Sequence, residues 1–491
     1  GRIDGGAYAR SLSGLECVRA IEPNRRETFF VVCIVERDMT DFDLLVIGGG
    51  TGNNVAAAAA DAGLETALVE PGPLGGTCLN RGCNPSKMLI QAANAVNHVH
   101  DAEQFHVDAT LDGVDYAAVV DEMDDLLGGI AADMEARYRD KENLTLFKER
   151  TEFVGERTVR LEGEAVTAEK VVVAAGSRPI VPPIDGLEDV DYLTSQDALY
   201  LRERPESLVI LGGGYIAVEL GYFFEAMGTD VTIVEMMDSL IPREDGDVAE
   251  AFTDIAADRH DVYTGHRVTA VEEASGGYAV HAETETGDET TVEGSEVLVA
   301  LGRRPNSDTL TLETAAIEVD DRGFIQTDEY LQTTAENVWA QGDIAGNALF
   351  KHSGDYETRH TVANAVHEES RAIDLSAMPH TIFTEPQIAG VGATEEDLND
   401  EDTEYVVGQA DYADSAMGRA KKLDHGFVKI LAAPDGEILG AHAIGYEAST
   451  LLHEAVLAMR TGATVDDVAG TIHAHPTLSK VVEAAFRDVP L

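Results

Sequence analysis

The chain has 491 residues, of which 35 are Lys or Arg and 90 are Asp or Glu, giving a formal net charge of −55, and 44% are hydrophobic. At roughly 150 residues per domain, this length and hydrophobic content predict an ordered globular protein of about three domains rather than a disordered acidic chain. The acidity argues against nucleic acid and membranes as partners, and four cysteines are too few for a secreted disulfide framework, so we expect a cytoplasmic protein.

The negative charge is distributed unevenly along the chain. Residues 1–38 hold six Arg and six acidic residues, so the net charge belongs to the remainder, and the whole chain uses Lys only nine times. An acidic, lysine-poor surface is typical of proteins adapted to molar salt, where charge repulsion is screened over about 3 Å at 1 M. We therefore predict a halophilic protein, and we interpret residues 1–38 as a non-native or upstream leader outside the fold.

The first predicted unit after this leader is a β-strand, a glycine-rich loop and an alanine-rich helix. The strand covers 42–47, the loop follows at 48–53 with the sequence GGGTGN, and a second strand at 65–69 ends in Glu70. Glycines let the backbone approach a pyrophosphate at a helix N-terminus, and the acid accepts the ribose hydroxyls, so this unit predicts a dinucleotide-binding fold. The match is imperfect because Asn53 replaces the third glycine.

A second unit of the same kind begins about 160 residues later. Its strand at 208–211 precedes the loop GGGYIA at 212–217, and its next strand, at 230–234, ends in Glu235. A single glycine-rich loop is weak evidence, but two complete units predict an enzyme that binds two dinucleotides. Between the units we expect helices over 87–140 and short strands over 143–175, and after about residue 376 an α+β pattern.

Two cysteines lie five positions apart just beyond Glu70, in the segment GGTCLNRGCNPSK at 75–87. A helix N-terminus lowers the pKa of a thiol, so the position of Cys83 at a helix entry favours its thiolate. The alternatives are a metal-binding pair and an inert buried pair, but a metal requires further Cys or His ligands, which this segment lacks. We therefore predict a redox function for Cys78 and Cys83.

This cysteine segment, flanked by two dinucleotide-binding units, resembles the class I pyridine nucleotide–disulfide oxidoreductases. The segment 334–343, ending WAQGD, resembles the family's second FAD motif, and 174–179 and 301–306 resemble its two crossover motifs. The resemblance implies an α/β fold with two Rossmann-like domains and a C-terminal α+β dimerisation domain. The implied limits are 39–185 for the FAD domain, 186–305 for the NAD(P)H domain, 306–375 for a central segment returning to the FAD domain, and 376–491 for the dimerisation domain.

The same resemblance implies a route for electrons from NAD(P)H through FAD to the Cys78–Cys83 disulfide and then to a disulfide substrate. In this scheme Cys83 faces the flavin, Cys78 attacks the substrate, Lys87 pairs with Glu219 near flavin N5, and Tyr215 covers the nicotinamide pocket. The residues implied for FAD are Gly48, Gly50, Thr51, Gly52, Asn53, Glu70, Gly76, Thr77, Lys87, Gly176, Gly342 and Asp343. Those implied for NAD(P)H are Gly212, Gly214, Tyr215, Ile216, Glu219, Glu235 and Gly302.

His475, in the segment HAHPTLSK at 473–480, occupies the family's acid–base position. The resemblance implies a homodimer in which this residue completes the active site of the partner, where it protonates the leaving thiolate. One departure is important, because the family has Glu five residues after this His and this chain has Lys480. We expect Glu483, in the next turn, to take over the orienting role.

Within the family, three features distinguish this chain from dihydrolipoamide dehydrogenases, which usually carry an aliphatic residue at position 81, Gly at 53 and Glu at 480. The first loop and the run PSKM at 85–88 resemble mycothione reductase instead. Combined with a halophilic surface, they suggest the reductase of bis-γ-glutamylcystine, with Arg81 as a candidate substrate contact or simply one half of a salt bridge. A dihydrolipoamide dehydrogenase using NAD is one alternative, and a non-catalytic nucleotide-binding flavoprotein is another.

The electron donor is expected to be NADPH, which low-molecular-weight disulfide reductases of this kind generally use. Glu235 favours NADH, because an acid at the end of the second strand binds the ribose hydroxyls and repels a 2′-phosphate. Arg243 is a candidate partner for such a phosphate, and molar salt weakens the repulsion from Glu235.

Overall fold

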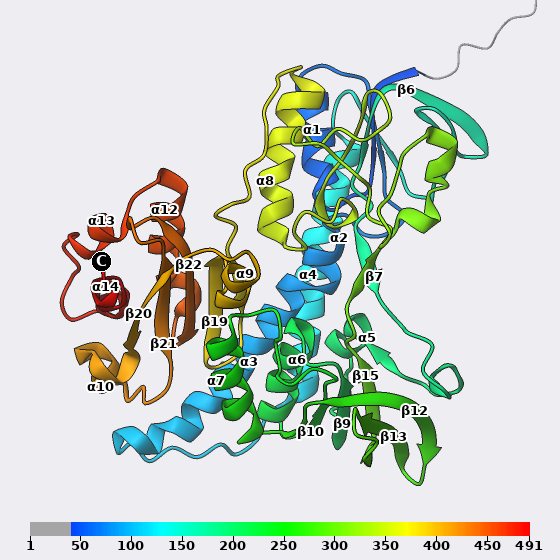
Figure 1. The fold of residues 1–491 in the computed structure, drawn as a ribbon. Coiled ribbons are helices and arrows are strands. Elements are labelled where there is room, and N and C mark those ends of the chain that lie inside the picture. Colours follow the sequence, from blue (N-terminus) through cyan, green and yellow to red (C-terminus); the bar gives the residue numbers. More distant parts are fainter. Residues whose placement is uncertain (1–40) are drawn as a thin grey trace, which may run out of the picture.

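The computed structural model describes residues 41–491, so the interpretation of residues 1–38 lies outside the described range. Three regions follow one another: a first sheet with its helices, a second sheet with its helices, and a C-terminal region that lies to one side of both (Figure 1). The first two are built on parallel strands and the third on an antiparallel sheet. The predicted α/β fold with a C-terminal α+β region is confirmed.

The first sheet has the order β3-β2-β1-β6-β5-β4, and β17 pairs with β6 beyond this path. Residues 44–47 of β1 are buried and apolar, as expected for a central parallel strand covered on both faces. Because β17 comes from 306–375, this segment returns to the first sheet. The strands are β1 Asp41–Ile47, β2 Thr66–Val69, β3 Leu144–Phe147, β4 Phe153–Gly155, β5 Thr158–Leu161, β6 Glu164–Val173 and β17 Val338–Ala340.

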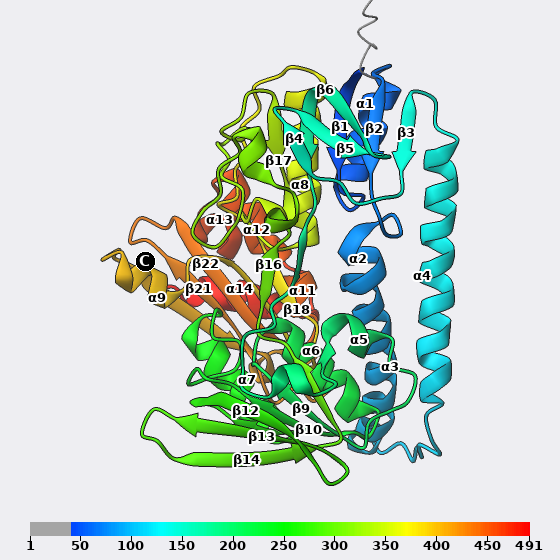
Figure 2. The same cartoon turned by 90° about the vertical axis from the view of Figure 1, so that its right-hand side faces the viewer.

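Two long helices, α3 and α4, come between β2 and β3 in the chain and run beside each other along one side of the molecule, from the first sheet to the second (Figure 2). Apolar side chains such as Leu89 of α3 and Met123 of α4 share one core with Phe223 and Leu298 of the second region, so the two regions are packed together. The helices of the first region are α1 Gly52–Asp61, α2 Gly76–Arg81, α3 Cys83–Asp101, α4 Tyr116–Arg139 and α8 Lys351–Thr361.

The second sheet is parallel, with the order β11-β10-β9-β15-β8, and an antiparallel sheet β12-β13-β14 lies next to it. The short strands β7 and β16 pair where the chain crosses between the two regions. The strands are β7 Ser177–Pro179, β8 Leu193–Thr194, β9 Ser207–Leu211, β10 Asp230–Val234, β11 Asp261–Tyr263, β12 His266–Ala274, β13 Gly277–Thr284, β14 Glu289–Gly294, β15 Glu296–Val299 and β16 Arg303–Pro305. The helices are α5 Ser195–Leu199, α6 Tyr215–Ala226 and α7 Gly246–Ala257.

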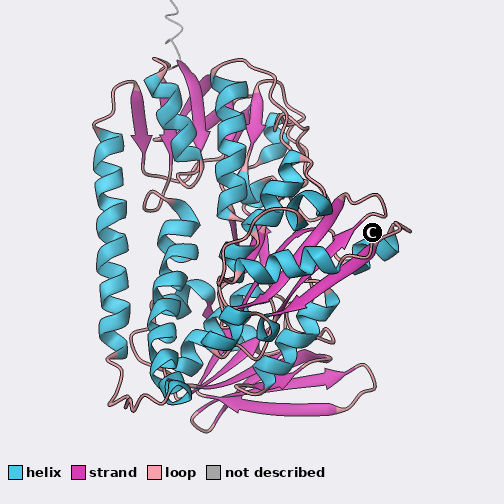
Figure 3. Ribbon diagram, turned by 90° about the vertical axis from the view of Figure 1, so that its left-hand side faces the viewer, coloured by secondary structure: helices cyan, strands magenta, loops and turns pink. Residues whose placement is uncertain are grey.

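The C-terminal region is an antiparallel sheet, β18-β19-β22-β21-β20, with helices against it (Figure 3). The amphipathic helix α14 buries Val481, Val482 and Phe486 in the core of this region and contacts β20 and β21. The strands are β18 His380–Ile382, β19 Gln387–Gly392, β20 Val406–Asp411, β21 Phe427–Ala432 and β22 Ile438–Gly445. The helices are α9 Glu395–Asp400, α10 Ala416–Lys421, α11 Ala448–Leu451, α12 His453–Thr461, α13 Val465–Ala469 and α14 Ser479–Asp488.

The parallel strands decide where a ligand site forms. The loops that follow β1, β6 and β17 leave the same edge of the first sheet, because all three strands run in one direction. This edge faces α2 and α3, so the first glycine-rich loop, the cysteine segment and residues 341–343 meet there. Among residues 41–491, no helix is both long and apolar enough to cross a bilayer.

Candidate active site

The glycine-rich loop after β1 lies directly against the start of α2. Gly48 has φ +110°, which an L-residue with a side chain rarely adopts, and a Cβ on Gly76 would lie 2.6 Å from the Cα of Gly50. The amide of Gly75 also donates to the carbonyl of Gly49 over 2.8 Å. This close approach of two backbones positions the cysteine helix beside the predicted dinucleotide loop.

Glu70 stabilises the same loop from the end of β2. Its carboxylate is buried and accepts hydrogen bonds from the amides of Gly49 at 2.7 Å and Gly72 at 2.8 Å. The side chain of Asn53 is buried, with its amide 3.3 Å from the sulfur of Met134 on α4, and it does not line the pocket described below. At the preceding position, Gly52, a side chain does not fit, since a Cβ there would lie 2.8 Å from the side chain of Val46.

The opposite wall of the site carries a half-buried arginine. Arg303 donates to the hydroxyl of Ser177 at 2.9 Å and to its carbonyl at 2.8 Å, while its nearest carboxylate oxygen, on Asp343, is 3.8 Å away. Ser177 in turn donates to Asp343. Burial lowers the pKa of Arg303, although the charge of Asp343 acts in the opposite direction. A cationic side chain facing a glycine-rich loop fits the pyrophosphate of a dinucleotide such as FAD.

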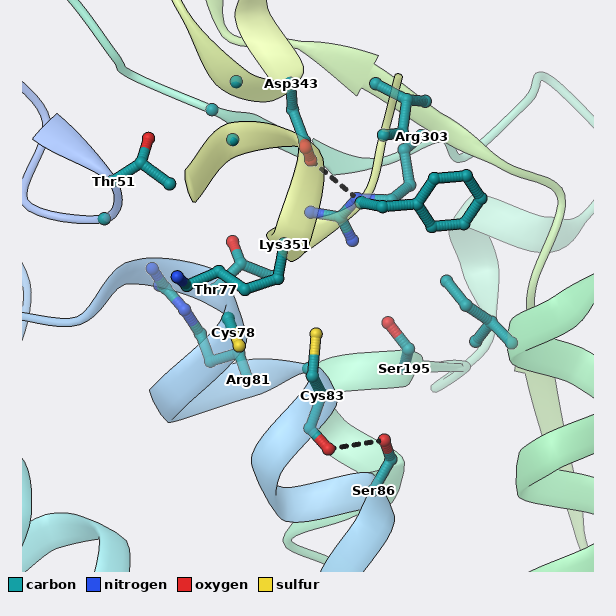
Figure 4. Close-up of a pocket in the computed structure, with 18 of the residues that line it drawn as sticks. Thr51, Thr77, Cys78, Arg81, Cys83, Ser86, Ser195, Arg303, Asp343 and Lys351 are labelled. Carbon is teal, nitrogen blue, oxygen red and sulfur yellow. Dashed lines mark hydrogen bonds and ion pairs between the residues drawn. The ribbon is translucent and has the colours of Figure 1, made fainter. Parts of the chain in front are cut away.

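Arg303, Asp343 and residues Gly50 and Thr51 of the first glycine-rich loop line one pocket together with the two cysteines (Figure 4). Its lining contains four cationic residues, Arg81, Lys87, Arg303 and Lys351, and two acidic ones, Glu219 and Asp343. The pocket is therefore locally cationic in a chain of net charge −55, which favours anionic ligands. The other predicted residues in its lining are Gly50, Thr51, Thr77, Cys78, Cys83, Gly176, Tyr215, Ile216 and Gly342.

Several predicted residues lie outside this lining. They are Gly48, Gly52, Asn53, Glu70, Gly76, Gly212, Gly214, Glu235, Gly302 and His475. Gly48 lies within the first loop, Gly76 packs against it, and Glu70 accepts a hydrogen bond from the amide of Gly49.

The two thiols occupy adjacent helices. Cys78 lies inside α2, and Cys83 is the first residue of α3, where unpaired helix amides favour a negative charge. Both cysteines are unpaired thiols in this structure. The neighbouring thiol of Cys78 and the charge of Lys87 lower the pKa of Cys83 to about 7. The neighbouring Cys83 and burial raise the pKa of Cys78, whose thiol donates to Oδ1 of Asn84 at 3.7 Å, so a thiolate is favoured at Cys83 rather than at Cys78.

Lys87 is one turn further along α3. Its ammonium lies 2.6 Å from the carboxylate of Glu219 on α6 and 4.7 Å from the ring centroid of Phe383. The other oxygen of Glu219 accepts from the amide of Phe383 at 2.9 Å. The predicted Lys87–Glu219 contact is therefore formed, and it joins the first region to the second and to the start of the C-terminal region.

Arg81 is located between the two cysteines, and its side chain lines the pocket beside Cys78 (Figure 4). It forms no ion pair with any acid among residues 41–491, and its buried Nε has no hydrogen-bond partner there. The alternative of an intramolecular salt bridge is thus not realised in the described part of the chain.

The second glycine-rich loop repeats the geometry of the first. Glu235, buried at the end of β10, accepts from the amide of Gly213 at 2.5 Å and from that of Met237 at 2.8 Å. Gly212, with φ +103°, is in the loop between β9 and α6, as Gly48 is in the loop between β1 and α1. The two loops therefore have the same backbone arrangement, each held by the carboxylate of a buried glutamate.

His475 is exposed and forms no side-chain hydrogen bond within residues 41–491 of its own protomer. The expectation that Glu483 orients His475 is wrong, because the two residues of one protomer do not contact each other. The carboxylate of Glu483 instead pairs with Lys480 and, at 2.8 Å, with Arg487, and it lies 3.8 Å from Nδ1 of His473. The physical reason is proximity along α14, where residues three and four positions apart face each other. Lys480 thereby has its charge compensated and does not act on His475 as a free cation.

Several residues of this site were not predicted from the sequence. Ser177 and Arg303 belong to the recognised crossover motifs, so their positions gave a signal, although their contact depends on the pairing of β7 with β16. Phe350 and Lys351 follow the second FAD motif at the start of α8 and also line the pocket. Glu244, which accepts a hydrogen bond from Tyr215, carries no motif that would have identified it.

The comparisons with known proteins agree with this geometry. Residues 42–368 match the pyridine nucleotide-disulphide oxidoreductase family, and residues 378–486 match the dimerisation domain of that family. Dihydrolipoyl dehydrogenase of Halobacterium salinarum is 39% identical, with 91% of this chain and 96% of the relative covered. Mycothione reductase of Mycobacterium tuberculosis is 35% identical, with 91% and 99% covered.

A solved structure resembles the chain over the same range. The HOCl-induced flavoprotein disulfide reductase RclA from Escherichia coli matches with a TM-score of 0.81 and 27% identity, covering 91% of this chain and 99% of that one. The family implies FAD and a nicotinamide dinucleotide as cofactors, and the glycine loops, Glu70 and Arg303 fit them. The chain belongs to the pyridine nucleotide-disulphide oxidoreductase family and forms homodimers through its C-terminal domain.

Proposed function

We propose that this oxidoreductase reduces a low-molecular-weight disulfide that carries carboxylates, bis-γ-glutamylcystine, at the expense of NADPH. FAD, when bound, would supply two-electron transfer between the dinucleotide and the Cys78–Cys83 pair. The observation that carries the proposal is Arg81, a cation beside Cys78 that no acid among residues 41–491 neutralises. Bis-γ-glutamylcystine offers four carboxylates, and a guanidinium binds a carboxylate in a planar, two-pronged contact.

The reduced cysteine pair would react by thiol–disulfide exchange. The sulfur of Cys78 attacks one sulfur of the substrate, forming a mixed disulfide and releasing the first γ-glutamylcysteine thiolate. Cys83 then attacks Cys78, which restores the Cys78–Cys83 disulfide and releases the second product. The raised pKa of Cys78 means that its attack needs a base. His475 of the partner subunit would take that proton and return it to the leaving thiolate.

The test is the substitution Arg81→Val, which removes the cation and leaves both cysteines. Hydrogen bonds to charged groups contribute about 1.5–3 kcal/mol, so kcat/KM for bis-γ-glutamylcystine should fall roughly 10- to 150-fold. Turnover of lipoamide, which has no carboxylate, should hold or improve. Arg267→Val is the matched control, because Arg267 is an exposed residue of β12 outside the pocket and its loss changes the net charge equally.

An equal loss for both substrates in Arg81→Val would show that Arg81 supports the local fold instead.

The second candidate function, dihydrolipoamide dehydrogenase, is favoured by the 39% identity to the Halobacterium salinarum enzyme. A panel of bis-γ-glutamylcystine, glutathione disulfide and lipoamide in molar KCl separates the two. Lipoamide turnover far above that of the other disulfides would support the second candidate.

The same panel is run with NADPH and with NADH. The Glu235 loop favours NADH, because it repeats the Glu70 loop, whose proposed ligand FAD has no 2′-phosphate. We keep NADPH as the proposed donor on the basis of the family resemblance. A higher kcat/KM with NADH in molar salt would contradict this part of the proposal and leave the disulfide assignment intact.

A further inference from the structure

A buried glutamate outside every recognised motif binds the side chain that covers the proposed nicotinamide pocket. Glu244 lies in the loop between β10 and α7, and its side chain is 1% exposed. One of its carboxylate oxygens accepts from the hydroxyl of Tyr215, and the other lies 2.8 Å from Nε2 of His380. Tyr215 begins α6 in the second region, whereas His380 begins β18 of the C-terminal region.

The ring of Tyr215 packs against two other aromatic rings. Tyr215, Phe350 and His380 form three nearly parallel rings, with 6.2 Å between each pair of centroids and interplanar angles of 15–19°. Burial and the adjacent Glu244 raise the pKa of Tyr215, so its hydroxyl stays protonated and donates to the carboxylate. The phenol is therefore fixed at both ends in the conformation that lines the pocket beside Glu219.

The loop that carries Glu244 is itself anchored to the C-terminal region. The next residue, Asp245, is fully buried and binds the ammonium of Lys429 on β21 at 2.7 Å. Two consecutive acids thus bind two basic residues of the dimerisation domain, which leaves little freedom for the carboxylate of Glu244. A movement of Tyr215 must break a charge-assisted hydrogen bond whose acceptor cannot follow it.

We infer that Glu244, held by His380, latches Tyr215 over the nicotinamide position, so that the dimerisation domain sets part of the affinity for the dinucleotide. The inference rests on the proposed function and on the family resemblance, which implies that Tyr215 covers the nicotinamide pocket. When only an open conformation binds a ligand, the apparent Kd equals the intrinsic Kd divided by the open fraction. Strengthening the closed conformation therefore weakens binding, and releasing the latch tightens it.

The test measures the equilibrium Kd of the oxidised dinucleotides, NADP⁺ and NAD⁺, by calorimetry on the holoenzyme in molar KCl. Glu244→Gln keeps the size of the side chain and removes its charge, and Tyr215→Phe removes the hydroxyl. Because hydrogen bonds to charged groups are stronger than neutral ones, each variant should bind about 3- to 10-fold more tightly. The double variant should gain nothing further, since both changes release the same contact.

Two additional variants separate a latch from a general structural effect. His380→Phe keeps the ring stack and removes the contact with Glu244, so it should tighten binding in the same direction and also remains informative if Glu244→Gln fails to fold. Glu250→Gln, on the exposed side of α7, changes the net charge equally and should leave the Kd at the wild-type value.

The possible results discriminate clearly. An unchanged Kd in Glu244→Gln, or an effect of this substitution that persists in the Tyr215→Phe background, overturns the latch. An unchanged Kd in Tyr215→Phe overturns it as well, because the phenol then does not restrict entry. A wild-type protein that binds neither dinucleotide contradicts the proposed function itself, and the latch with it.

Discussion

The two thiols of the site have opposite environments although they are only five residues apart. Cys83 begins a helix and has the charge of Lys87 near by, whereas Cys78 lies within α2 and its thiol donates to Oδ1 of Asn84 at 3.7 Å. In the proposed exchange Cys78 is the nucleophile, so it must lose its proton to a base before it attacks, whereas the thiolate of Cys83 is favoured without one. Lys87 contributes to this asymmetry through its charge, and Glu219 opposes it.

The first prediction concerns the pH at which this thiolate forms. In the reduced protein, thiolate absorbance near 240 nm should rise with a midpoint of about 7, well below the ordinary thiol value of about 8.5, and Cys83→Ser should abolish this step. Lys87→Met should move the midpoint upward, since a cation that favours the thiolate is lost. A midpoint near 8.5 in the wild type, or one indifferent to Lys87, would refute the assigned cause.

At the level of elements, the strands, loops and helix starts that were predicted correctly are those marked by short sequence patterns. The strand at 230–234, the loops after β1 and β9 and the position of Cys83 at a helix entry all follow from spacing within about 30 residues. The pattern alone did not reveal that Asn53 turns toward α4, because this contact joins residues 81 positions apart.

The residues that were missed depend on contacts between regions of the chain. Arg303 reaches Ser177 only because β16 pairs with β7, and Glu244 meets His380 only because the C-terminal sheet packs against the second region. The motifs at 174–179 and 301–306 indicate where Ser177 and Arg303 lie but not that they meet, and the contact between Glu244 and His380 has no motif at all. The Glu483 expectation failed for the opposite reason, since a local contact with Lys480 and Arg487 on α14 replaced the predicted one.

A second prediction follows from the position of the element that carries His475. This segment is exposed and does not line the pocket of its own protomer, and Ile472 next to it is 97% exposed. If His475 of the partner subunit completes each site, Cys78→Ser and His475→Ala homodimers should both be nearly inactive. Mixed subunits from a 1:1 exchange should recover about one quarter of wild-type activity, because half of the dimers are then mixed and each has one intact site.

Mixing without any recovery, under conditions where subunit exchange is shown by mass spectrometry of labelled chains, would contradict a shared site. A His475→Ala homodimer with normal turnover would exclude His475 as the acid–base group. Measuring subunit exchange at low and at high salt serves as the control that the dimers dissociate and re-form during mixing.

At the scale of the whole molecule, the charge of −55 per protomer makes the dimer dependent on salt. Repulsion between protomers extends over about 10 Å at 0.1 M ionic strength but only about 3 Å at 1 M. Transfer from molar KCl to about 0.1 M should therefore dissociate the dimer and abolish activity, which sedimentation velocity and turnover measure together. A dimer that keeps full activity for hours in dilute buffer would contradict the halophilic interpretation.

The central claim is that Cys78 and Cys83 form the redox pair that the dinucleotide reduces. The most direct measurement mixes the oxidised holoenzyme anaerobically with one equivalent of NADPH or NADH in molar KCl, then alkylates the denatured protein and counts modified residues by mass spectrometry. Our account predicts that the peptide spanning residues 76–87 gains two alkyl groups, one on Cys78 and one on Cys83, as one dinucleotide is oxidised. Oxidation of the dinucleotide with this peptide still in its disulfide form, or no oxidation at all, would contradict the account and favour a nucleotide-binding flavoprotein without disulfide turnover.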